Sequence, residues 1–345
     1  MENSFTISLD NLDDENKLFP PLRLGHCMAC VGNYVIVYGG ASIASVIRDD
    51  LWVLDTTTSI WKRYDLPSCV ERRCLASAIC TFEDNVYIFG GTDVPEGDRI
   101  SNILLSYHVI QNRWETLYDP ENSNEDNDVP KMYNASIHYH DNYIWVIAGT
   151  NGDHFLGTIL RFCLRNHTWS QVETFGMVKT PISLGNCTLF ENKFYYFNNL
   201  DLSPIAFSRI RVFDLVSQNW EDMPTKSSTN TFPDNRIGES IVLCDHYVYL
   251  VGGRRPNMVH NGKKFEECFS ISVFLENIWR IDLKTLEWEK TDLILKPGVS
   301  YHKNAFVTPD VLYIFGGINS DMCMVTGIKA LKVTDASKVC KNLPE

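Results

Sequence analysis

The chain has 345 residues, of which 44% are hydrophobic and 21% charged, and its formal net charge is −12. This acidity argues against a broad nucleic-acid surface, because phosphate binding requires a basic face. No apolar run approaches the roughly 18 residues of a membrane span, and Met1 to Phe19 lack the basic and apolar regions of a signal peptide. We therefore expect a globular protein of the cytoplasm or nucleus, with no nucleic-acid or membrane partner.

A short apolar run that ends in two small residues recurs along the whole chain. Glycine tolerates a positive φ and close approach of neighbouring backbone, which crowded strand ends require. Asparagine is the best substitute for glycine at such positions, so the fourth copy is degenerate but retained. The six copies are Val35–Gly40, Val86–Gly91, Ile144–Gly149, Phe194–Asn199, Val248–Gly253 and Leu312–Gly317.

Each copy is followed by a second apolar segment, then in most units by a tryptophan, and is preceded by a further strand-like run. Four short strands per unit, with turn residues between them, are typical of a propeller blade. The second segments are Leu51–Asp55, Ile103–Val109, Ile159–Leu164, Ile210–Leu215, Ile278–Leu283 and Ile328–Val333, and the tryptophans are Trp61, Trp114, Trp169, Trp220 and Trp288.

These patterns predict an all-β, six-bladed kelch β-propeller that occupies residues 1–345 as a single domain. An open propeller would leave two unpaired edges, and the last unit has no tryptophan after its third strand. We therefore expect Phe5–Leu9 to be the outer strand of the last blade, which would close the ring. The expected blades are 22–65, 73–118, 131–173, 182–223, 236–291 and 300–340.

The 11 cysteines are scattered, which favours free, mostly buried thiols in a reducing compartment. A zinc site at Cys27 and Cys30 would need a second ligand pair, and residues three apart on a strand point to opposite faces. His138 and His140 share a face but have no evident third ligand. No P-loop, GxSxG, HExxH or Rossmann pattern stands in the right context. We expect no metal, no cofactor and no catalysis.

The second connection of each blade and the connection between blades are long and share one face, and such loops usually carry function. The longest insert, Arg254 to Asn277, contains Arg254, Arg255, Lys263 and Lys264. A second insert, Asp119 to Asp128, is acidic, and we interpret it as a solvated loop.

Polar and aromatic residues precede each innermost strand, where they would surround the channel mouth. The arginine fork donates two parallel charge-assisted bonds to a carboxylate, so this ring is a candidate anion site. The alternative is that these arginines pair with acidic residues and hold the loops in place. The candidates are Arg23, Arg73, Lys131, Tyr133, Arg236, Tyr301 and His302.

The repeated Gly-Gly and tryptophan pattern identifies the chain as similar to kelch-repeat proteins. Within them it most resembles the kelch domain-containing protein ten group, through Arg23–His26, Leu75–Ser77, Phe89–Pro95, Thr231–Pro233 and Tyr301–His302. Members of that group look like substrate receptors of cullin-RING ubiquitin ligases, in the ubiquitin conjugation pathway. They bind C-terminal degrons, typically ending in glycine, in the channel mouth. The resemblance implies binding roles for Arg23, Arg73, Tyr133, Arg236, Tyr301 and His302; Lys131 stands where the group tends to have arginine.

The tail departs from that group. An adaptor-binding box begins with Ser or Thr and then Leu, with Cys four positions after the Leu; counted back from Cys340, those places hold Asp335 and Ala336. Two hypotheses follow. The chain is a ligase receptor, with client C-terminal tails, an elongin adaptor and a cullin as partners, or it is a scaffold that binds a folded partner without a ligase.

Overall fold

The computed structural model describes residues 4–7, 18–70, 73–93, 99–121, 129–176, 186–197, 206–256, 258–260, 265–267 and 272–333. Within these ranges the regular structure is β-sheet, apart from two 3-10 turns at Ser68–Val70 and Ala206–Ser208. None of the described helical segments is long and apolar enough to cross a membrane. The chain divides into two compact units: Asp14–Asn198 with Arg211–Glu221, and Met1–Asp13 with Asn199–Ile210 and Asp222–Glu345.

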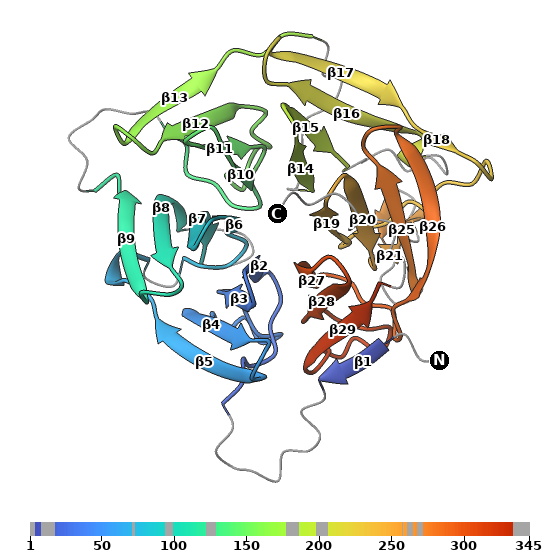
Figure 1. Cartoon of the computed structure of the whole chain (residues 1–345), viewed down its shortest axis with the longest axis horizontal. Helices are drawn as coiled ribbons and strands as arrows, with labels where there is room; N and C mark the ends of the chain where they lie inside the picture. The colour runs from blue at the N-terminus through green and yellow to red at the C-terminus, as the bar shows by residue number, and fades with distance from the viewer. Residues whose placement is uncertain are drawn as a thin grey trace, which may run out of the picture. The chain divides into compact units, whose positions relative to one another are not determined.

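The first of these units holds blades 1 to 3 and most of blade 4, each a four-stranded antiparallel sheet in sequence order (Figure 1). The short strands follow the apolar runs of the repeat. Short turns separate the first strand of a blade from the second and the third from the fourth, whereas longer connections join the second strand to the third. Blade 1 is β2 (Cys27–Val31), β3 (Tyr34–Tyr38), β4 (Asp50–Asp55) and β5 (Ile60–Asp65); blade 2 is β6 (Ala78–Phe82), β7 (Asn85–Thr92), β8 (Ile100–His108) and β9 (Arg113–Tyr118); blade 3 is β10 (Ser136–His140), β11 (Tyr143–Ile147), β12 (Ile159–Cys163) and β13 (Thr168–Val172); blade 4 is β14 (Cys187–Phe190), β15 (Lys193–Tyr196), β16 (Arg209–Asp214) and β17 (Asn219–Pro224).

The other unit holds blades 5 and 6. Blade 5 is β19 (Ser240–Cys244), β20 (Tyr247–Val251), β25 (Asn277–Asp282) and β26 (Glu287–Ile294), with β18 (Lys226–Ser227) added in parallel at its outer edge. Blade 6 is β27 (Lys303–Thr308), β28 (Val311–Phe315), β29 (Ile328–Lys332) and β1 (Ser4–Ile7), which pairs antiparallel with β29. The predicted closing strand, Phe5–Leu9, is confirmed over Phe5–Ile7 and begins one residue earlier, at Ser4. Ser8 and Leu9 lie outside the described residues. The described residues thus form the six antiparallel blades of the predicted all-β class, while their treatment as one domain stays a prediction.

The core consists of apolar layers between consecutive blades of a unit, where alternate strand residues of two sheets meet. Separate clusters join blades 1 and 2, blades 2 and 3, blades 3 and 4, and blades 5 and 6. The outer-strand tryptophans contribute to these layers: the centre of the Trp169 ring of blade 3 lies 5.5 Å from that of Phe89 of blade 2. The Trp288 indole N–H donates to the Phe207 carbonyl at 3.0 Å.

The Gly-Gly pairs end the second strands where neighbouring blades approach most closely. Gly39 has φ 64°, and a Cβ there would lie 2.1 Å from the Cys74 carbonyl oxygen of blade 2. Ala148 replaces the first glycine in blade 3 and keeps a positive φ of 59°. The predicted reason for these glycines, left-handed backbone and close approach, is therefore confirmed at Gly39.

Candidate functional site

A turn with one left-handed residue leads into the innermost strand of most blades, and the predicted site residues lie in and around this inner-strand turn. The left-handed residue of one blade donates its backbone N–H to its counterpart in the preceding blade, at 2.7 Å from Ala76 to Gly25 and 2.6 Å from Tyr301 to Gly238. The turn residues and their φ values are Gly25 (62°), Ala76 (55°), Asn134 (53°), Gly238 (68°) and Tyr301 (60°). The predicted residues occupy different positions of the turn, so they are not equivalent to one another.

Arg23 lies two residues before the turn residue of blade 1, and its side chain is fully buried. Its guanidinium donates to the Asp50 carboxylate at 2.6 Å and to the Gly39 carbonyl at 3.0 Å, and its Nε donates to the Pro21 carbonyl at 3.0 Å. The indole N–H of Trp52 donates to the same carboxylate at 2.9 Å. In this conformation Arg23 ties the turn to the third strand, which is the structural alternative raised from the sequence.

Arg236 occupies the same position in blade 5, with one change. It donates to the Gly252 carbonyl at 3.0 Å and the Asp234 carbonyl at 3.1 Å, but the third-strand partner is the Asn277 amide oxygen, at 3.3 Å. Asn277 stands where blade 1 has Asp50, at the first residue of the third strand. Burial lowers the pKa of Arg236 to about 10, although Glu239 and Asp234 favour its charged form. Among the described residues, this buried cation is held by neutral acceptors.

Arg254 and Tyr301 meet beside Arg236. An antiparallel bridge joins Ile237 to Arg254, and the Arg254 guanidinium, itself buried, donates to the Tyr301 hydroxyl at 3.1 Å and lies 5.7 Å from the centre of its ring. Tyr301 is 39% exposed, so the residue is partly accessible. We call Arg236, Arg254 and Tyr301, with the adjoining Asp234, Glu239 and Arg255, the blade 5–6 cluster.

His302 follows Tyr301 but points into the protein. It is 1% exposed and packs beneath Gly252, where a Cβ would lie 2.6 Å from its ring. Burial lowers the pKa of His302 to about 3, with a further contribution from Lys303. Neither ring nitrogen has a hydrogen-bond partner in the described part of the chain. Its geometry is that of a neutral packing residue and not of a ligand-binding one.

The remaining predicted residues belong to the other unit. Arg73 is half-buried and donates to the Cys69 carbonyl at 3.3 Å, Lys131 is exposed, and Tyr133 is half-buried with its backbone bridged to Thr150. Their participation with the blade 5–6 cluster in one ring stays a prediction. Lys263, Lys264 and the tail from Thr334 lie outside the described residues, as does most of the acidic insert.

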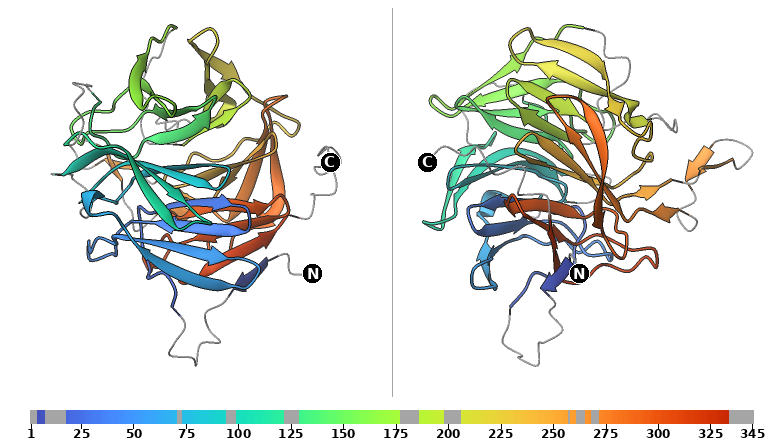
Figure 2. Two further views of the ribbon diagram at one scale, coloured as in Figure 1. Left: turned by 60° about the vertical axis from the view of Figure 1, so that its left-hand side comes forward. Right: turned by 45° about the vertical axis from the view of Figure 1, so that its right-hand side comes forward.

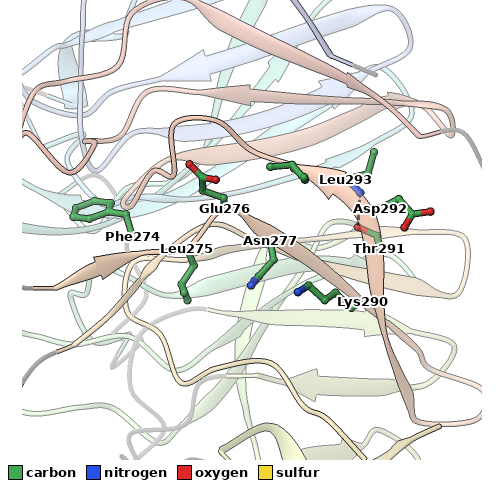
Figure 3. Close-up of a pocket in the computed structure, with 9 residues that line it drawn as sticks. Phe274, Leu275, Glu276, Asn277, Lys290, Thr291, Asp292 and Leu293 are labelled. Atoms are coloured by element: carbon green, nitrogen blue, oxygen red, sulfur yellow. Dashed lines mark hydrogen bonds between the residues drawn. The ribbon is translucent and has the colours of Figure 1, made fainter. Parts of the chain in front are cut away.

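A groove that the sequence did not predict lies beside the cluster in blade 5 (Figure 3). It forms where β25 and β26 lose regular pairing between Asn277 and Trp279. The Leu293 N–H donates to the Thr291 hydroxyl at 3.2 Å inside this irregular stretch. Its lining has two acidic residues, Glu276 and Asp292, and one basic residue, Lys290, so the charge of the groove does not favour anions. It is lined by Phe274–Asn277 and Lys290–Ile294.

The described residues contain no group of three or more side chains suited to hold a metal ion. The cluster therefore offers hydrogen-bond donors, a positive charge and an aromatic surface. Groups of this kind suit anions and polar chain ends as ligands.

Comparison with known proteins agrees with the repeat pattern. Kelch domain-containing protein 10 of Xenopus tropicalis is 24% identical over 328 residues, covering 88% of this chain and 73% of the relative. The human protein of the same name is 23% identical over 323 residues, covering 87% and 67%. Kelch-like protein 40 of Xenopus laevis is 24% identical over 225 residues, covering 65% and 33%. The predicted resemblance to the kelch domain-containing protein ten group is thus confirmed.

The family model described as the KLHDC2/KLHL20/DRC7 Kelch-repeats domain matches residues 13–198, more than half of the chain. Kelch-repeat propellers are protein-interaction modules, and the chain belongs to this kelch-repeat family.

Proposed function

We propose that this kelch protein is a non-catalytic recognition module that binds the C-terminal ends of client proteins, as the substrate-recognition subunit of a cullin-RING ubiquitin ligase. The contact between Arg254 and Tyr301 carries the proposal. It holds a guanidinium, a phenol hydroxyl and an aromatic ring together, and these groups suit a terminal carboxylate and the residue attached to it.

Charge supports an anionic ligand at this place. The blade 5–6 cluster contains three arginines (Arg236, Arg254 and Arg255) and two carboxylates (Asp234 and Glu239), a net charge of 3 − 2 = +1 in a protein of net charge −12. A desolvated charge-assisted hydrogen bond contributes about 1.5–3 kcal/mol. Two of them would supply a large part of the ~8 kcal/mol that micromolar affinity requires.

Backbone strain at Tyr301 supports the same assignment. A bulky residue at φ 60° is an outlier with a cost of about 1–3 kcal/mol. The corresponding residues are smaller: glycine in blades 1 and 5, alanine in blade 2 and asparagine in blade 3. Such strain persists where the surrounding structure enforces it, most often at binding and catalytic sites. The strained backbone places an aromatic side chain beside Arg254 that a glycine could not supply.

To test the proposal, the protein is used to select binders from a library of random decapeptides with free C-termini. Its affinity for each selected peptide is then measured with the C-terminus free and with the C-terminus amidated. We expect amidation to weaken binding about tenfold or more, since it removes the negative charge. Arg254→Lys and Tyr301→Phe should weaken binding too. The matched control is Arg161→Lys in blade 3, another arginine stacked on tyrosine, at 4.8 Å from the Tyr143 ring. Equal affinity for both peptide forms would refute carboxylate recognition.

The ligase role has its own test. Purification of the tagged full chain from cells should bring down an elongin adaptor and a cullin with the clients. A preparation that contains stable partners but neither of those subunits would instead favour the scaffold hypothesis.

One observation favours that alternative, in which a folded partner binds across the loops. The second connections of blades 1 and 3 are closed by equivalent bridges, Ala41 to Ile47 and Thr150 to Phe155. Both connections expose apolar side chains: Ile43, between the bridge residues of blade 1, is 61% exposed, and Phe155, a bridge residue of blade 3, is 45% exposed. If a scaffold role dominates, Ile43→Ser should remove the partner while Arg254→Lys leaves it bound.

A further inference from the structure

The described strands of the second connection of blade 5 form a β-ribbon. The connection runs from residue 252 to 276, 25 residues, whereas the same connection has 11 residues in blade 1 (39–49) and 12 in blade 6 (316–327). Two short ladders form within it: β21 (Arg254–Arg255) pairs with β24 (Val273–Phe274), and β22 (Met258–His260) pairs with β23 (Phe265–Glu267), both antiparallel. In the right-hand view of Figure 2 the orange strands of this ribbon stand away from the sheet of blade 5.

The base of the ribbon is part of the blade 5–6 cluster. Arg254 is the first residue of β21 and bridges Phe274 on one side and Ile237 on the other. Its guanidinium donates to the Tyr301 hydroxyl, and the Leu275 N–H continues the ladder to the Gly253 carbonyl at 2.9 Å. A client peptide whose C-terminus is bound at Arg254 and Tyr301 would therefore have its last residues at the base of the ribbon.

The outer part of the ribbon has open edges. Within the described residues β22 and β23 form a sheet of two strands, and neither pairs with a third. Such edges carry unpaired N–H and C=O groups that accept another strand, and an isolated two-stranded hairpin is only marginally stable in water. A third strand would satisfy one edge and stabilise the ribbon.

We propose that this ribbon binds, by strand addition, the client segment directly preceding its C-terminal residue. The inference rests on the proposed function, which fixes the carboxylate at the blade 5–6 cluster. Main-chain hydrogen bonds would supply affinity for an extended segment with little dependence on its side chains. An extended peptide of six residues is about 20 Å long at roughly 3.3 Å per residue, so we expect paired contact to extend about six residues upstream of the C-terminus.

The experiment compares a selected decapeptide with a tripeptide of the same C-terminal sequence. In the shortened variant, residues 256–272 are replaced by Asn-Gly. This two-residue turn joins Arg255 to its antiparallel partner Val273 and suits a tight hairpin. The replacement also removes Ser272, whose hydroxyl accepts a hydrogen bond from Arg254 at 3.4 Å. Ser272→Ala in the full-length chain is therefore the matched control.

We expect the native protein and Ser272→Ala to bind the decapeptide about tenfold or more tightly than the tripeptide, and the shortened variant to bind both equally. N-methylation of successive decapeptide amides should weaken binding at alternate residues, since antiparallel pairing uses every second amide on one edge. Preference for the decapeptide in the shortened variant, or no alternation, would overturn the inference. If amidation abolishes binding while shortening changes nothing, the ribbon inference alone fails; if amidation has no effect, the proposed function fails.

Discussion

Exchanging the third-strand partners of the two buried arginines should move stability in opposite directions. In blade 1 the Asp50 carboxylate accepts from Arg23 at 2.6 Å and from the Trp52 indole at 2.9 Å, with all three side chains buried. In blade 5 the Asn277 amide takes that place beside Arg236. The reciprocal variants Asp50→Asn and Asn277→Asp each convert one arrangement into the other without a change in side-chain size.

Asp50→Asn removes one partner of a buried ion pair, which costs about 3–5 kcal/mol. The amide oxygen can still accept one hydrogen bond, so we expect the lower end of that range. Asn277→Asp supplies the missing carboxylate and gains about 1–2 kcal/mol, the value of a charge-assisted bond reduced by desolvation. The gain should vanish at acidic pH, where the new carboxyl group is protonated.

Urea unfolding followed by tryptophan fluorescence measures both changes, with Asp310→Asn, at an exposed turn, as the control. The reasoning is wrong if Asp50→Asn costs less than about 0.5 kcal/mol, the usual effect of a surface substitution. It is also wrong if Asn277→Asp destabilises the protein by as much as Asp50→Asn.

Further predictions concern buried histidine and one turn. The pKa of His302, lowered to about 3, is below its unfolded value of about 6.5, so the unfolded state binds more protons between these values and stability falls as the pH falls below about 6.5. The loss is about 2 kcal/mol at pH 5; urea titrations from pH 7.5 to 5 should show it, and His302→Asn should reduce the slope. Cys163 ends the third strand of blade 3, where blades 1 and 4 have Asp55 and Asp214, each accepting two turn N–H groups. Cys163→Asp should therefore raise stability by about 0.5–1.5 kcal/mol; a loss would refute the equivalence. The backbone N–H groups of Asn166 and Arg165 lower the pKa of Cys163, whereas burial raises that of Cys187. Mass mapping should find Cys163 alkylated by iodoacetamide before Cys187, and the reverse order would contradict the pKa difference.

The fold was predictable because the repeated sequence pattern marks where each strand and each blade ends. Gly39 lies at a strand end where a Cβ atom would clash with the neighbouring blade. The apolar run before each Gly-Gly pair has the length of a strand. The closing strand followed from the absence of a last tryptophan together with an apolar run at Phe5. Local sequence carries this information, since strand ends and turns are decided within a few residues.

The roles of the arginines were not predictable from the turn sequence. Arg23-Leu-Gly and Arg236-Ile-Gly read alike, but their partners stand 27 and 41 residues downstream, across a connection of variable length. Alignment of the third strands would have found the difference, because Asp50-Leu-Trp in blade 1 corresponds to Asn277-Ile-Trp in blade 5. His302 was misjudged for another reason: it directly follows the left-handed turn residue Tyr301, and the turn directs its side chain into the protein, where it is 1% exposed.

Three features of blades 5 and 6 lie close to Arg236 and Arg254. Asn277, the third-strand partner of Arg236, is an amide where blade 1 has the Asp50 carboxylate. The second connection of blade 5 spans 25 residues. Tyr301 occupies the left-handed turn position, where blades 1 and 5 have glycine, blade 2 has alanine and blade 3 has asparagine. A bulky side chain at this φ strains the backbone, and a long connection is not needed to build a blade. Because Arg254 touches Tyr301, bridges Ile237 and begins the ribbon, a ligand bound at this place, as proposed above, would account for these features together.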